Sequence, residues 1–405
     1  MDEPANFDTL FIGQYYWPEP IGSGPYCRDL AESLAQSGRR VMVLTCRPHY
    51  PGGAVFADYR RGARDREIEA GVVVRRVRTW IPKRRSAGHR ILSELWFFVQ
   101  GMAALFMGRV PRSELVVCLC PTIFAVLLGG FARRKYGRTL ALVHDIQSGL
   151  AVGLGLVGDG RIVRLMRALE RFAFNRVDQI LVLSEPMRRR LVELGVRTPI
   201  SILPIWVDTA SIFPIDGRAR DTVTLLYSGN LGRKQALDQL IDLASALEAR
   251  QSSIRVILRG EGGESASLRR EAVRRGLRNL DFEPLVGADA LNRGLADGDI
   301  HLVPQDGRAA DFAVPSKIYA IMAAGRPLIA TARPGTAVDA LRTESGAFEC
   351  VPPGDIDALT EAVLRLAGDS SLRRRLGARG RAFVMEKHDR ARVLGSFLAE
   401  VAHGA

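Results

Sequence analysis

Short apolar runs alternate with segments of helical periodicity along almost the whole chain. The runs Thr9–Ile12, Val41–Thr45 and Leu115–Leu119 are apolar or nearly so, which is typical of strands buried on both faces of a parallel sheet. Between such runs, segments such as Pro25–Gln36 place apolar residues three and four positions apart, which predicts amphipathic helices. Regular alternation of strand and helix predicts an α/β protein with parallel sheets.

The alternation stops once, at residues 204–220, where no period is visible and Pro204, Pro214 and Gly217 occur. We therefore predict two doubly wound, Rossmann-like domains that face each other across a cleft. The predicted boundaries are 1–205 for the first domain, 206–221 for a linker and 222–384 for the second domain, with a C-terminal helix in 385–405 that packs back on the first domain. A cleft between two such domains is the default place for a ligand.

The segment from Val314 to Ala330 has the pattern of a loop, a helix and a buried strand. Pro315 suits the first turn of a helix, and Gly325 suits its end. Ser316 and Lys317 place a hydroxyl and a cation at the same helix start, which would favour a phosphate. The alternative is an ordinary helix and strand of the sheet. Two glycine-rich loops, Ser228–Lys234 and Gly260–Gly263, also follow predicted strands.

Three features of the first half are candidates for ligand contact. Gly22-Ser23-Gly24 precedes a helix, where free N–H groups can bind an anion or a sugar hydroxyl, although a flexible connection has the same composition. His144-Asp145 ends a predicted strand, where open α/β sheets bind ligands; an aspartate cap beside a solvated histidine is the alternative. Gly153–Gly158 matches GxGxxG but lacks the tight strand-to-helix context, so we interpret it as a loop.

The chain of 405 residues carries 57 basic and 44 acidic residues, a net charge of +13. No long basic run, aromatic-interleaved patch or zinc-finger spacing occurs, so nucleic acid is not an expected partner. An anionic membrane surface or a phosphate-bearing substrate fits the charge. In the segment 82–107, a basic cluster precedes an apolar, aromatic helix, which predicts docking on an anionic membrane. A core helix with a solvated basic flank is the alternative.

The five cysteines are odd in number and form no CxxC pair, which disfavours a disulfide framework or a structural zinc site. No signal peptide is recognisable. Leu115–Ala132 runs 18 residues without a charge, but Pro121 divides it into a strand and a helix. The Asp-x-Asp pairs at 297 and 355 fit cap and turn roles better than a metal site. We expect a cytoplasmic protein, at the inner face of the plasma membrane, with no cofactor and no metal.

Taken in order, these motifs resemble the retaining glycosyltransferases of family 4, which have the GT-B fold. The resemblance covers nearly the whole chain and is strongest to enzymes of capsule, O-antigen and colanic-acid synthesis. It is carried by Gly22-Ser23-Gly24, His144-Asp145, Leu183-Ser184-Glu185, Tyr227 to Lys234, Arg259 to Gly262, and Pro315 to Pro327. The family implies transfer of a sugar from a UDP- or GDP-linked donor to a lipid-linked or polysaccharide acceptor, with the acceptor at the first domain and the donor mainly at the second.

The resemblance also implies roles for individual residues. His144 and Asp145 would be catalytic, with His144 touching the donor sugar. Arg233 and Lys234 would neutralise the diphosphate, on which charge grows as the glycosidic bond breaks. The full set of implied donor-binding residues is Gly22, Ser23, Gly24, Asn230, Arg233, Lys234, Gly260, Glu261, Pro315, Ser316 and Lys317.

One departure from the family pattern concerns its Glu-x7-Glu pair. The two positions are Phe312 and Ala320 here, with Asp311 as a neighbouring carboxylate. The second Glu of the family contacts the nucleotide ribose, so its loss leaves the nucleotide preference open. Two alternatives to an active transferase follow: a non-catalytic GT-B-like scaffold subunit, or a GT-B sugar-nucleotide epimerase.

Overall fold

The computed structural model describes residues 7–19, 23–49, 53–81, 87–149, 160–215, 222–306 and 315–402. The chain forms two compact units. The first comprises Met1–Leu203 together with Leu394–Ala405, and the second comprises Pro204–Val393. The prediction had placed this division at residue 205 and the end of the second domain at residue 384.

The first unit is built on an eight-stranded sheet with the order β3-β4-β2-β1-β5-β6-β7-β8. Neighbouring strands are parallel, except that β3 pairs antiparallel with β4. The strands are β1 (Thr9–Ile12), β2 (Val41–Cys46), β3 (Arg66–Glu69), β4 (Val72–Val77), β5 (Ser113–Cys120), β6 (Arg133–Val143), β7 (Gln179–Val182) and β8 (Ile200–Ile202).

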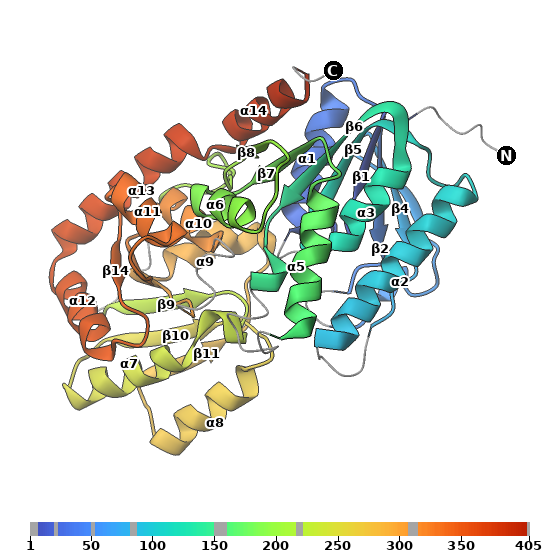
Figure 1. The fold of residues 1–405 in the computed structure, drawn as a ribbon. Coiled ribbons are helices and arrows are strands. Elements are labelled where there is room, and N and C mark those ends of the chain that lie inside the picture. Colours follow the sequence, from blue (N-terminus) through green and yellow to red (C-terminus); the bar gives the residue numbers. More distant parts are fainter. Residues whose placement is uncertain are drawn as a thin grey trace. The chain divides into compact units, whose positions relative to one another are not determined.

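Helices cover this sheet (Figure 1). They are α1 (Gly24–Gln36), α2 (Ala87–Phe106), α3 (Ile123–Ala132), α5 (Arg161–Phe174) and α6 (Glu185–Glu193), with a 3₁₀ turn η1 at Ala57–Tyr59. As predicted, Pro121 separates β5 from α3. Within the described ranges, no helix has the length and apolar character needed to cross a membrane.

The second unit is built on a six-stranded, fully parallel sheet with the order β11-β10-β9-β12-β13-β14. Its strands are β9 (Thr224–Ser228), β10 (Arg255–Arg259), β11 (Leu280–Glu283), β12 (Ile300–Val303), β13 (Leu328–Thr331) and β14 (Glu349–Val351). Its helices are η2 (Arg233–Gln235), α7 (Asp238–Ala249), α8 (Ser265–Arg275), η3 (Ala288–Ala290), α9 (Leu291–Ala296), α10 (Lys317–Ala323), α11 (Ala337–Ser345), α12 (Ile356–Gly368) and α13 (Ser370–Lys387). The last helix, α14 (Arg390–Ala402), begins in this unit and belongs to the first unit from Leu394 onward.

Both sheets contain the doubly wound order 3-2-1-4-5-6. It runs β4-β2-β1-β5-β6-β7 in the first unit and β11-β10-β9-β12-β13-β14 in the second. The strand order therefore reverses between β1 and β5 and between β9 and β12, which is where such folds bind ligands. The predicted fold of two Rossmann-like units is confirmed.

The stretch after Leu203, expected as a linker at 206–221, has ordered partners in its described part. The Val207 amide donates to the His388 carbonyl (2.9 Å), and Arg381 of α13 donates to the carbonyls of Thr209 and Ile212. These contacts place residues 204–215 within the second unit. These bonds are all accepted by backbone carbonyls, so they leave no hydrophobic period in the sequence.

Candidate functional site

Two glycine-rich loops interlock at the carboxyl ends of β9 and β10. The Gly229 amide donates to the Arg259 carbonyl and the Gly260 amide to the Glu283 carbonyl, each at 2.9 Å. Gly229 and Gly260 have φ angles of 144° and 148°, which L-residues with a side chain rarely adopt. A Cβ on Gly260 would also overlap the Gly229 carbonyl oxygen. Only glycine allows the two loops to approach this closely.

Lys317, at the start of α10, directs its ammonium group toward the first of these loops. The residue as a whole is half-buried, but its Nζ atom is shielded from solvent. Nζ lies 3.8 Å from the centre of the Tyr227 ring, and a Cβ on Gly229 would lie 2.7 Å from it. Within the described part of the chain, no hydrogen-bond acceptor reaches Nζ.

Burial lowers the pKa of Lys317 from 10.5 to about 7. A shielded amine without an acceptor costs free energy unless a partner arrives, so the site favours an anion placed over the Gly229 loop. Tyr227 is fully buried beneath this amine, and its hydroxyl donates to the Asn230 carbonyl (2.6 Å). Burial also raises the pKa of Tyr227, which keeps its hydroxyl neutral.

The structure thus brings together Asn230, Gly260 and Lys317 of the predicted donor residues. Tyr227 and Gly229 also belong to this site, although neither of them was assigned a role from the sequence. The glycine-rich loop Ser228–Lys234 contains Gly229 and so indicated its position, whereas no pattern in the sequence shows that the ring of Tyr227 contacts Lys317.

The other predicted donor residues lie around this centre rather than in it. Pro315 and Ser316 are half-buried directly before Lys317. The side chain of Arg233 is 71% exposed, with Nε 3.6 Å from Glu264, and Glu261 is exposed. Lys234 lies in η2, and its side chain, like Asp311 and Phe312, lies outside the described residues.

In the first unit, the start of α1 lies beside the end of β6. Gly24 is buried, and a Cβ there would lie 2.7 Å from the Glu19 carbonyl oxygen. The ring of Tyr26 meets the His144 ring edge-on, with centroids 5.8 Å apart. Ser23 caps the helix without a side-chain bond, and Gly22 lies outside the described residues.

His144 is buried, which contradicts the alternative of a solvated histidine. Burial lowers the pKa of His144 to about 4, and the smaller effect of Asp145 opposes this shift. Nε2 of His144 is buried and has no hydrogen-bond partner among the described residues. His144 is therefore neutral at pH 7 and can still form one hydrogen bond. Asp145 is half-buried beside it.

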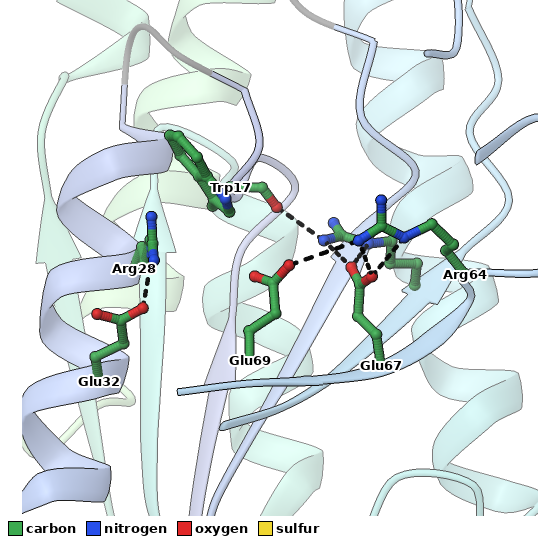
Figure 2. A network of polar contacts seen from close by, with 7 residues as sticks. Trp17, Arg28, Glu32, Arg64, Glu67 and Glu69 are labelled. Carbon is green, nitrogen blue, oxygen red and sulfur yellow. Dashed lines mark hydrogen bonds and ion pairs between the residues drawn. The ribbon is translucent and has the colours of Figure 1, made fainter. Parts of the chain in front are cut away.

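An ionic network built around the buried side chain of Arg76 anchors the loop that leads from β1 toward α1 (Figure 2). Nη2 of Arg76 in β4 donates to the Trp17 carbonyl (2.8 Å) and to Glu67 of β3 (2.6 Å). Arg64 pairs with the same Glu67 at 2.8 Å and lies 3.9 Å from Glu69. The unpredicted strand β3 thus supplies the Glu67 carboxylate that holds Arg76 under this loop.

The Asp-x-Asp pairs have structural roles. Asp355 caps α12 by accepting from the Ala358 amide (2.9 Å), Asp299 accepts from the Thr224 amide (2.8 Å), and Asp297 binds Arg259 (2.9 Å). No group of three His, Cys, Asp or Glu residues that could hold a metal occurs in the described ranges.

Comparison with known proteins decides the family. Residues 22–206 match the model of the glycosyl transferase 4-like domain, and residues 222–369 match that of glycosyl transferases group 1. The chain is 32% identical over 371 residues to the putative colanic acid biosynthesis glycosyl transferase WcaI of Escherichia coli K12, covering 87% of this chain and 90% of the relative. The chain belongs to the family 4 glycosyltransferases.

Solved structures with similar folds show that the chain has the GT-B fold of this family. Sucrose-phosphate synthase from Thermosynechococcus elongatus superposes with a TM-score of 0.77 at 17% identity, covering 98% of this chain and 99% of that one. The Anabaena protein HepE, solved in complex with UDP-glucose, superposes with a TM-score of 0.72 at 14% identity, covering 98% and 100%. The protein is therefore a GT-B glycosyltransferase.

Proposed function

We propose that this glycosyltransferase moves a sugar from a UDP- or GDP-linked donor to a lipid-linked or polysaccharide acceptor in bacterial surface polysaccharide synthesis, with retention at the anomeric carbon. The observation that carries the donor assignment is the shielded Nζ of Lys317 over the Gly229 loop, with no acceptor in the described chain. A relative named for colanic acid biosynthesis and a structural neighbour solved with UDP-glucose support the same substrate class.

In this proposal Lys317 binds the diphosphate of the donor. Negative charge grows on the leaving diphosphate as the glycosidic bond breaks, and a cation held in place stabilises that charge. Gly229 and Gly260 leave room for the phosphate oxygens to approach the backbone closely. An anion bound beside Lys317 raises the pKa of the amine and keeps it protonated. With this cation in place, the proposed reaction needs no metal ion.

His144 is proposed to contact the transferred sugar through its free Nε2. Because the imidazole is neutral at pH 7, it serves as a hydrogen-bond partner for a sugar hydroxyl and not as a cation. Retention is proposed to follow a front-face path, in which the leaving phosphate oxygen accepts the proton of the acceptor hydroxyl. This path requires no separate general base.

Calorimetric titration of the full chain with UDP and with GDP tests the donor site. We expect one of the two nucleotides to bind with micromolar affinity, and Lys317→Met to weaken that binding at least tenfold, or about 1.4 kcal/mol. Lys387→Met is the matched control, because Lys387 is a surface residue of the same unit paired with Glu344.

Binding of neither nucleotide by the folded wild type would contradict the proposal. So would equal weakening by the Lys317 and Lys387 substitutions, since that would show a loss of stability or net charge and no local contact. The nucleotide that binds then defines the carrier for a screen of donor sugars.

A further inference from the structure

Three helices lie side by side on one face of the first unit's sheet. α3 packs against β1, β5 and β6, with α2 on one side of it and α5 on the other (Figure 1). Side chains that such a layer leaves exposed point away from the sheet, so the three helices present one outer face. This outer helix face carries two features that a water-facing surface does not need.

The first feature is an apolar stripe along α2. The helix buries one side through Phe97, Gly101 and Ala104. Its opposite side is also apolar and reaches 50% exposure at Leu92 and 77% at Phe106. The exposed members recur at helical spacing over a helix about 30 Å long; they are Ile91, Leu92, Leu95, Trp96, Val99 and Phe106. An exposed stripe of this length marks an interaction surface.

The second feature is a row of arginines on α5. Arg161, Arg164 and Arg171 are exposed, and none of them forms an ion pair with a described residue. The one carboxylate of this helix, Glu170, is buried and accepts from Ser148. Leu165 is 71% exposed between the arginines, so α5 also offers apolar contact.

The cationic character continues around the rest of the layer. Arg109 and Arg112 follow α2 and are exposed, and Lys135 is exposed after α3. The nearby carboxylates Glu114 and Asp178 are already paired with Arg134 and Arg133. A groove beside the C-terminal end of α5 is lined by Arg171, Phe172, Asn175 and Arg176.

We propose that the outer helix face of α2, α3 and α5 docks on a lipid bilayer that carries anionic headgroups. Leucine, valine and aromatic side chains of α2 would enter the boundary between headgroups and acyl chains, and the arginines of α5 would bind phosphates. Trp96 suits this boundary, because its indole N–H donates to the Arg78 carbonyl (3.2 Å) while its ring is partly exposed. The inference rests on the proposed function, because a lipid-linked acceptor would be reached at such a surface.

A second copy of the chain fits this face less well. A two-fold interface would bring the same patch of each copy together, so both copies would contribute the arginines of α5 to one interface. This accumulation of positive charge opposes association. Anionic lipid supplies the opposite charge and the apolar layer together.

Sedimentation with vesicles tests the docking. We expect the full chain to sediment with vesicles of phosphatidylcholine mixed with phosphatidylglycerol at low salt, less at high salt, and little with phosphatidylcholine alone. The double variant Leu92→Glu/Val99→Glu should lower the partition coefficient at least tenfold. Arg164→Gln/Arg171→Gln should lower it several-fold and reduce its salt dependence.

Matched controls lie on α8 in the second unit. Val273→Glu changes an exposed apolar residue and Arg270→Gln an exposed arginine, and both should leave vesicle binding unchanged. Nucleotide titration of the α2 variant separates the two proposals, because its donor binding should persist while vesicle binding is lost.

Three results would overturn the inference. The first is no sedimentation of the folded wild type with anionic vesicles at low salt. The second is an equal loss of vesicle binding in the α8 controls. The third is a change from dimer to monomer in the α2 variant, seen by sedimentation velocity, with vesicle binding intact, which would assign the face to a second copy.

Discussion

The Nζ atom of Lys317 lies 3.8 Å from the centre of the Tyr227 ring and is shielded from solvent, with no hydrogen-bond acceptor among the described residues. The two residues come from α10 and β9, far apart in sequence. An amine held on an aromatic face gains cation–π attraction but still lacks the hydrogen bonds it has in water. This pair is therefore arranged for binding at a cost in the stability of the free protein.

Lys317→Met should stabilise the ligand-free protein. Methionine has a similar length and keeps contact with the Tyr227 ring, and it removes a shielded polar group whose desolvation costs about 1–3 kcal/mol. Urea unfolding at neutral pH would show the gain as a higher midpoint with an unchanged slope. An equal or lower midpoint would mean that Nζ has a stabilising partner in the free state.

The affinity for the nucleotide diphosphate should fall as the pH rises above 7. The pKa of Lys317 is about 7 in the free protein, so an anion that needs the charged amine must add a proton at higher pH. The dissociation constant should rise up to about tenfold per pH unit between about pH 7.5 and 8.5, where the phosphate itself no longer titrates. Titration in buffers of different ionisation enthalpy would show the proton uptake.

In Lys317→Met, nucleotide binding should take up no proton, and its weaker affinity should not change with pH over the same range.

The stability of the ligand-free wild type should change with pH in the opposite direction to its nucleotide affinity. Because the folded pKa lies below the unfolded value of 10.5, the unfolded chain binds more protons, and stability rises with pH by up to about 1.4 kcal/mol per unit between these values.

Mild acid should destabilise the protein through two buried histidines. Burial lowers the pKa values of His144 and His301 to about 4 from a reference of 6.5. Between these values the unfolded chain binds more protons, so each histidine removes about 1 kcal/mol of stability from pH 7 to about pH 5.5. Unfolding of His144→Phe at both pH values should show a loss about 1 kcal/mol smaller than that of the wild type. Equal losses would show that His144 is protonated in the folded state.

Gly260→Ala should destabilise the second unit by about 2–4 kcal/mol, because a Cβ at a φ of 148° would meet the Gly229 carbonyl oxygen. Gly263→Ala in the same loop is the control. A Cβ on Gly263 would have open space around it, so the substitution should be nearly neutral. Thermal unfolding of both variants measures the difference, and similar midpoints would contradict the interlocked loops.

Arg76→Met should cost about 3–5 kcal/mol, because it leaves the Trp17 carbonyl and Glu67 without their buried partner. Arg64→Met is the comparison, since the side chain of Arg64 is 44% exposed and its pairing with Glu67 should contribute less than about 1 kcal/mol. Denaturant unfolding followed by tryptophan fluorescence would report both changes. A mild effect at Arg76 would mean that water replaces the lost bonds.

Much of the fold could be predicted because the buried strands of both sheets are continuous apolar runs. The elements that were not predicted lack this signal. β3 has only Ile68 as an apolar residue, and that side chain faces solvent, so its pairing with β4 depends on backbone bonds and on the partners of Glu67. β14 and α11 are short elements near the edge of the second sheet, where few buried positions remain to form a period.

The sequence indicated which type of ligand the candidate site would bind, but not how its residues are arranged. Glycines after strands and a lysine at a helix start indicate a phosphate site, and the structure brings Gly260 and Lys317 together. The sequence does not show that the cation of Lys317 is shielded while the side chain of Arg233 is exposed, because the exposure of each side chain depends on which strands become neighbours. β12 lies beside β9, so the helix that follows β12 carries Lys317 to Tyr227.

The first unit is not a continuous stretch of chain, since it takes in Leu394–Ala405, which includes most of α14. Glu400 accepts from Gln179 of β7 and, at 3.2 Å, from Ser201 of β8. On a translating ribosome, the first 203 residues emerge before Pro204–Val393 is made, a delay of about 10–40 s. During that interval the edge of the first sheet has no final helix, so nascent chains released early would expose it to chaperones and proteases. Completion of the first unit thus requires that the second unit has already been synthesised.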